Sequence, residues 1–228
     1  MAKKLTEEKA RALSFHVTEA YRKARTSLVY SIIKKGCKKI VFTSPHKGEG
    51  KTTTAINIAA ALAQQVDCRV LIIDCDLRRP SAHTRLSVQP EKGLAHYLNN
   101  ECQLDDIIVK TSLDQLDLIS YGEIPPNPSE LLSSEMMSDM VSELEKRYDF
   151  IIFDTPPVIS VADVIPLIGL SDGMVLVIRH NSTTYPELDK AVDSLKRNNA
   201  KIIGMIVNKV PTPETSKGGY YVSDSIGG

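Results

Sequence analysis

A glycine-containing segment near the middle of the first hundred residues has the residue types that bind phosphate. Residues 44–52 read SPHKGEGKT; the apolar run 39–43 precedes them and an Ala-rich stretch, 52–65, follows. This context predicts a strand, a loop and a helix in succession. The two glycines allow backbone N–H groups to face phosphate oxygens, and the helix start adds the positive end of its dipole.

The side chains of this loop define a nucleotide site with bound magnesium. We expect the Lys51 ammonium to reach the β- and γ-phosphate oxygens and the Thr52 hydroxyl to ligate Mg²⁺. Pro45 stands where the strict phosphate-loop pattern has its first glycine, so the match is to a variant loop. The predicted nucleotide contacts are Lys47, Gly48, Glu49, Gly50, Lys51, Thr52 and Thr53.

Three aspartates lie at the ends of two other apolar runs. Asp74 ends the run 70–74, Asp76 follows it by two residues, and Asp154 ends the run 150–154. In a parallel sheet the carboxyl ends of the strands share one edge, where ligands bind. Carboxylate oxygens suit Mg²⁺. The three aspartates are therefore predicted to belong to the same site.

Some neighbouring residues allow two interpretations. Either Arg78 or Arg79 could stabilise the charge on a transferred phosphoryl group, and a solvent-exposed loop pair explains them equally well. Asn208, which follows the last apolar run, is a predicted contact to the nucleotide base, although turn chemistry also accounts for an Asn-Lys pair there.

Composition excludes several classes of protein. The 228 residues carry 28 basic and 28 acidic side chains, which argues against a broad nucleic-acid surface. The four cysteines form no CxxC pair, so a zinc site is not expected. No apolar run approaches the length of a membrane span, and the charged start does not resemble a signal peptide. These features predict a cytoplasmic protein.

The order of the elements predicts an α/β fold of the P-loop type, with a mostly parallel central sheet and helices on both faces. One domain is expected over residues 1–210, with a helix over about 18–35, capped by Thr18, after a loosely held start. Short helices are expected over 93–100 and 105–109. Residues 211–228 read as a flexible tail. The predicted strands are 39–43, 70–74, 116–119, 150–154, 174–179 and 201–207.

Three motifs together resemble one family. The run 71–80, LIIDCDLRRP, is similar to that family's second phosphate motif; the others are the loop 44–52 and the segment 151–157. They resemble the bacterial tyrosine kinases of capsule and exopolysaccharide synthesis, and the likeness extends to the segment 127–132. Further points of resemblance are Glu19, Arg22 and Arg25 at the family's oligomerisation motif and Tyr220 and Tyr221 at its C-terminal tyrosine cluster.

The resemblance implies a function. ATP with Mg²⁺ would be the cofactor, with Lys51 on the phosphates and Thr52, Asp76 and Asp154 on the metal. Asp74 or Asp76 would act as the base; the sequence does not decide which. The family phosphorylates its own C-terminal tyrosines in trans, assembles into rings and regulates polysaccharide synthesis. A chain without a membrane span would be recruited to the inner face of the membrane by a separate transmembrane activator, and other proteins would also be substrates.

Rival interpretations remain. The deviant-Walker ATPases of chromosome partition and division-site placement share the three motifs, but their signature lysine is replaced here by His46. Such a protein would be a nucleotide-dependent switch, and a scaffold assembled by ATP is a third alternative. The spacing of residues 19, 22 and 25 also fits a solvated helix face, so the oligomerisation role depends on the resemblance.

Overall fold

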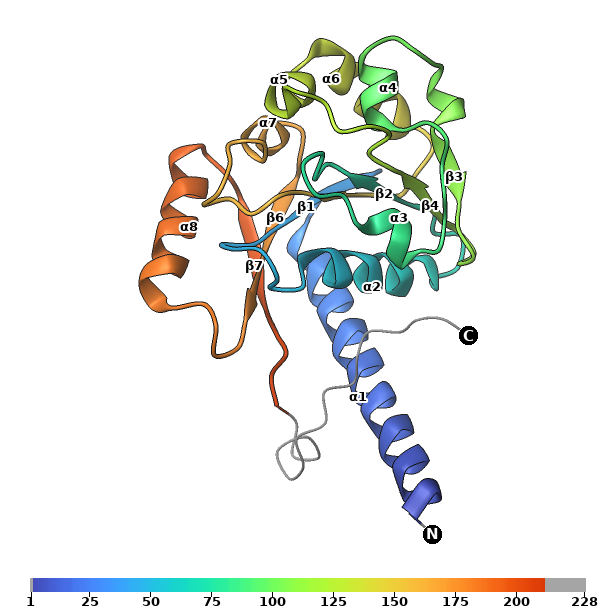
Figure 1. The fold of residues 1–228 in the computed structure, drawn as a ribbon, viewed down its shortest axis with the longest axis vertical. Coiled ribbons are helices and arrows are strands. Elements are labelled where there is room, and N and C mark those ends of the chain that lie inside the picture. Colours follow the sequence, from blue (N-terminus) through green and yellow to red (C-terminus); the bar gives the residue numbers. More distant parts are fainter. Residues whose placement is uncertain (1, 212–228) are drawn as a thin grey trace.

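The computed structural model describes residues 2–211, and describes side chains from Ser14 onward. A seven-stranded sheet in the order β3-β4-β2-β5-β1-β6-β7 forms its centre. The fold class predicted from the sequence is confirmed (Figure 1). The strands are β1 Lys38–Thr43, β2 Val70–Asp74, β3 Ile108–Lys110, β4 Leu116–Ile119, β5 Phe150–Asp154, β6 Gly173–Arg179 and β7 Ile202–Asn208.

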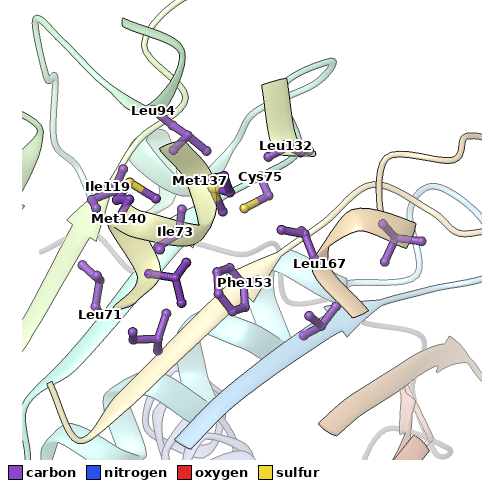
Figure 2. Packing of buried hydrophobic residues seen from close by; sticks show 14 of the residues in the cluster. Leu71, Ile73, Cys75, Leu94, Ile119, Leu132, Met137, Met140, Phe153 and Leu167 are labelled. Atoms are coloured by element: carbon purple, nitrogen blue, oxygen red, sulfur yellow. The ribbon is translucent and has the colours of Figure 1, made fainter. Parts of the chain in front are cut away.

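Helices cover both faces of this sheet. Helices α1 to α3 pack with one apolar cluster, and α4 to α8 with the other. Figure 2 shows the second cluster, where Met137 and Met140 lie over Ile73 and Phe153. The helices are α1 Ala2–Ser31, α2 Lys51–Ala63, α3 Ala82–Arg85, α4 Leu94–Leu98, α5 Pro128–Leu132, α6 Glu135–Leu144, α7 Ile165–Ile168 and α8 Tyr185–Arg197, with a 3-10 turn, η1, over Leu104–Asp106.

Strand register brings the chemical groups to one edge. Strands β1, β2 and β5 are parallel, and Asp154 pairs in register with both Phe42 of β1 and Asp74 of β2. Strands β2 and β5 are apolar up to their final aspartate, and β1 is apolar over residues 40–42, because both faces of the sheet are covered. The loop that follows β1 therefore begins beside the two aspartates.

Two predicted elements differ in the structure. The helix expected over 18–35 begins at Ala2 and ends at Ser31. Thr18 does not cap it: its hydroxyl donates to the Ser14 carbonyl four residues earlier, within the helix. The short helix expected over 105–109 is also wrong, because η1 ends at Asp106 and β3 then pairs antiparallel with β4.

Helix α1 extends well beyond the sheet (Figure 1). Its C-terminal part packs on α2: Leu28, together with Ile32 directly after the helix, is buried in the same cluster as Leu62. The Arg25 guanidinium donates to the Ala61 carbonyl at 3.1 Å. Within the described part of the chain, no helix is long and apolar enough to span a membrane. The predicted tail lies outside the described residues, apart from its first position, 211.

Candidate functional site

The phosphate loop joins β1 to α2 and requires glycine at two positions. Gly48 and Gly50 have φ angles of 85° and 90°, in the left-handed region that side chains disfavour. A Cβ atom at Gly50 would lie 1.9 Å from the Nδ2 atom of Asn208. Glycine is therefore required at position 50 for two reasons: the backbone conformation and the close approach of β7.

Glu49 anchors the loop from within. Its side chain is 2% exposed and accepts hydrogen bonds from the His46 N–H, at 3.0 Å, and from the Thr183 hydroxyl. The Asn208 amide donates to the Glu49 carbonyl at 3.0 Å. The loop is thus attached to the connection that follows β6 and to the end of β7. His46 also lies 3.1 Å from the Glu187 carboxylate of α8.

Lys51 occupies the centre of a buried charge cluster. Its ammonium lies 2.6 Å from Oδ1 of Asp154, 3.8 Å from Oδ2 of Asp76 and 3.3 Å from the Thr52 hydroxyl. Burial by itself would lower the pKa of Lys51, but the Asp154 and Asp76 carboxylates outweigh burial and leave the pKa raised. Lys51 is therefore cationic at neutral pH, and the structure brings together the residues that the motifs predicted.

Asp74 is fully buried, and backbone groups fix its orientation. Its two oxygens accept hydrogen bonds from the N–H groups of Asp76, Ser81 and Ala82 at 3.2, 3.1 and 3.0 Å. Burial, together with the nearby Asp154 charge, raises the pKa of Asp74 to about 7. A carboxyl group with such a pKa is suited to proton transfer near neutrality.

Asp76 lies closer to the surface of the cluster and is 9% exposed. Its Oδ1 atom accepts the N–H of Arg79 at 3.1 Å. Burial raises its pKa, while the Lys51 charge acts in the opposite direction.

The oxygens of this site fit a nucleotide-bound Mg²⁺. Asp154 Oδ2 is buried and has no hydrogen-bond partner among the described residues, so it is free to accept a metal-bound water or the metal. In the described part of the chain, no three His, Cys, Asp or Glu residues could hold a metal by themselves. Mg²⁺ in nucleotide sites takes only one or two carboxylates, with phosphates and waters completing its shell, so the two observations agree.

The two arginines after Asp76 differ in their surroundings. Arg78 forms a two-point ion pair with Asp163, Nε to Oδ2 at 2.7 Å and Nη2 to Oδ1 at 3.2 Å. Arg79 is exposed, and its backbone N–H contacts Asp76. Arg78 is thus bound to the connection after β5, and a contact of either arginine with a phosphoryl group stays a prediction.

Other predicted residues occupy separate places. Lys47 is exposed and Thr53 half-buried within the first turn of α2. On α1, Glu19 pairs with Arg22 at 2.7 Å, and Arg25 is engaged with α2. Tyr220 and Tyr221 lie outside the described residues.

Sequence reasoning missed the residues that support the site. Thr183 and Asp163 come from connections after β6 and β5, far along the chain from Glu49 and Arg78, and no local motif marks them. Ser81 could have been suspected as the residue before a short helix whose N–H groups face an acidic side chain.

The fold and this loop define the class of P-loop nucleotide-binding proteins. A family model described as AAA domain matches residues 37–203. The chain is 22% identical to a cell-division protein, the septum site-determining protein MinD of Pyrococcus horikoshii, with a TM-score of 0.63 over 79% of this chain and 76% of that one. At this identity the likeness concerns the fold alone.

Proteins similar to this chain in sequence show which family of P-loop proteins it belongs to. Tyrosine-protein kinase YwqD of Bacillus subtilis (strain 168) is 38% identical over 90% of this chain and 86% of that protein. Tyrosine-protein kinase CpsD of Streptococcus agalactiae is 34% identical over 89% and 88%. The kinase domain of the Escherichia coli tyrosine kinase ETK is 30% identical, with a TM-score of 0.79 over 91% of this chain and 80% of that one. The chain belongs to the bacterial tyrosine-protein kinases, as the resemblance implied.

Proposed function

We propose that this kinase transfers the γ-phosphate of ATP to tyrosines of its own C-terminal segment, in trans, with Tyr220 and Tyr221 as acceptors. The observation that carries the proposal is the buried cluster of Lys51, Asp74 and Asp154 beside the phosphate loop. It supplies a fixed cation for the phosphates, oxygens for a metal and a carboxylate able to take a proton.

We assign the roles within the site on the basis of this geometry. Lys51 would bind the β- and γ-phosphates, releasing its contact to Asp154 in part. Thr52, Asp76 and Asp154 would hold Mg²⁺, which supplies charge neutralisation for the transferred group. Asp74, whose oxygens already accept backbone hydrogen bonds, would receive the acceptor proton, either itself or through Asp76.

Control of capsular or exopolysaccharide synthesis by this phosphorylation is part of the same proposal. We include assembly into a ring through Glu19, Arg22 and Arg25, recruitment to the inner face of the membrane by a separate transmembrane activator, and other protein tyrosines as substrates. Phosphate on two adjacent tyrosines would add about −3 to −4 of charge. Such a charge would weaken contacts between subunits.

A mixing experiment tests transfer in trans. Lys51→Met protein with an intact tail, tagged for separation, is incubated with Mg-ATP and active Tyr220→Phe/Tyr221→Phe protein. Mass spectrometry should find phosphate on the tail of the tagged chain. Lys146→Met, a change at an exposed lysine of a surface ion pair, is the matched control and should retain autophosphorylation. Absence of phosphotyrosine from the wild-type tail, with only free phosphate released, would favour a nucleotide switch instead.

A further inference from the structure

The ion pair between Arg78 and Asp163 joins the two loops that carry the site's carboxylates. Arg78 lies two residues after Asp76, and Asp163 lies in the connection that follows Asp154 and leads to α7. The Asp163 side chain is 1% exposed, whereas the Arg78 side chain is 47% exposed. A buried carboxylate held by a planar guanidinium at two points has little freedom to move.

Each end of this ion pair is itself fixed to the site. On one side, the turn containing Arg78 holds Asp76, because the Arg79 N–H donates to both the carbonyl and the carboxylate of Asp76. On the other side, the Val158 N–H donates to the carbonyl of Ser44 at the start of the phosphate loop, at 2.9 Å. The pair therefore connects Asp76 to the base of the phosphate loop through the connection after β5.

A structural role alone does not require this arrangement. A surface pair contributes little to stability, and burying Asp163 carries a desolvation cost that Arg78 offsets only in part, since 47% of the Arg78 side chain is exposed. What the pair does provide is a fixed separation between the turn at Asp76 and the loop after Asp154. Those two aspartates are the proposed carboxylate ligands of Mg²⁺.

We infer that Asp163 is a positioning residue, which acts through Arg78 to hold Asp76 where it can serve the nucleotide-bound metal. The inference depends on the site assignment proposed above. It also gives Arg78 a function different from contact with the transferred phosphoryl group. Within the described part of the chain, the side chains of Arg78 and Asp163 form their hydrogen bonds and ion pair with each other and not with Lys51.

Nucleotide binding with and without metal tests the inference without relying on catalysis. The dissociation constant of a fluorescent ATP analogue is measured in excess EDTA and in saturating Mg²⁺, and their ratio defines the gain due to Mg²⁺. Asp163→Asn keeps the size of the side chain and removes its charge. We expect Asp163→Asn to reduce the gain due to Mg²⁺ about tenfold, as loss of a residue that supports a metal ligand does. The affinity of this variant in EDTA should stay within about twofold of the wild-type affinity. Arg78→Lys keeps one of two contacts and should give an intermediate loss.

A matched control separates positioning from stability. Asp172 also forms a long-range ion pair, with Lys34 at 3.0 Å, and accepts the Lys39 N–H, but its side chain is 20% exposed and it lies where β1 and β6 begin, at the strand ends opposite the site. Asp172→Asn should leave the Mg²⁺ gain unchanged, whatever its effect on the unfolding temperature. An equal loss in this control would overturn the inference, as would an Asp163→Asn protein that loses affinity equally in EDTA.

A second control separates failure of the inference from failure of the site assignment. Asp76→Asn should itself abolish most of the Mg²⁺ gain. If it does and both Asp163→Asn and Arg78→Lys retain the wild-type gain, the positioning role is wrong and the site assignment stands. If Asp76→Asn also retains the gain, Asp76 is not a metal ligand, and both that assignment and the positioning role of Asp163 fail.

Discussion

Replacement of the loop glycines offers a quantitative test of how the phosphate loop is held. Gly48 and Gly50 have nearly the same left-handed φ, 85° and 90°, so alanine should impose similar backbone strain at both, about 1–2 kcal/mol. A Cβ at Gly48 would meet no described atom within 4 Å, whereas a Cβ at Gly50 would lie 1.9 Å from Asn208 Nδ2. Gly50→Ala must therefore also displace Asn208 from the Glu49 carbonyl, a loss of about 1 kcal/mol more.

Urea unfolding of the nucleotide-free protein measures both costs. We expect about 1–2 kcal/mol of destabilisation for Gly48→Ala and about 2–3 for Gly50→Ala. In an Asn208→Ala background the clash is absent, so Gly50→Ala should cost only the strain, which gives a coupling of about 1 kcal/mol in the double-mutant cycle. If the two alanine variants lose the same unfolding free energy, with no coupling to Asn208, the inference that Asn208 of β7 holds the phosphate loop is refuted.

Three further results are expected from the charges and thiols. Lys51→Met leaves Asp154 and its neighbours buried without their cation and should cost about 3–5 kcal/mol of unfolding free energy at pH 8; an unchanged urea midpoint would contradict the cluster's geometry. Asp74 should titrate near pH 7 by carbon-13 NMR, against a usual value of 3.8, so the stability it contributes is present below about pH 4 and lost as pH rises through about 7; aspartates that all titrate below pH 5 would contradict this. At pH 8 Cys102, the half-buried thiol, should react first with a thiol reagent, and equally fast labelling of the others would contradict their burial. Those others are Cys37 and Cys68, whose pKa burial raises to about 11, and Cys75.

Local rules predicted the parts of the site that one stretch of chain builds. Lys51 and Thr52 follow from strand, loop and helix in succession, and the aspartates from the shared edge of a parallel sheet. The partners of Glu49 and Arg78 could not be predicted, because Thr183 lies 134 positions from Glu49 and Asp163 lies 85 from Arg78 along the sequence. Such contacts depend on how connections fold over the sheet edge, where no periodic pattern constrains them.

The same reasoning explains the misplaced helix start. Thr18 resembles a cap in sequence, but a threonine within a helix can donate its hydroxyl to the carbonyl four residues earlier, as it does here to Ser14. For Asn208, the structure adds a role that the sequence did not predict. The sequence marked it as a nucleotide contact, and that remains a prediction; in the structure its side chain holds the Glu49 carbonyl and accepts the Lys209 N–H.

A force on the projecting part of helix α1 would act at a long distance from the attachment of this helix to α2. The 30 residues of α1 would measure about 45 Å at the usual rise, and the described contacts attach its C-terminal part to α2 through Leu28 and the Arg25 bond to Ala61. Helix α2 begins at Lys51. A sideways force on the projecting end of α1 is therefore delivered as torque to the helix whose first residue is the proposed phosphate-binding lysine, unless those attachments yield first.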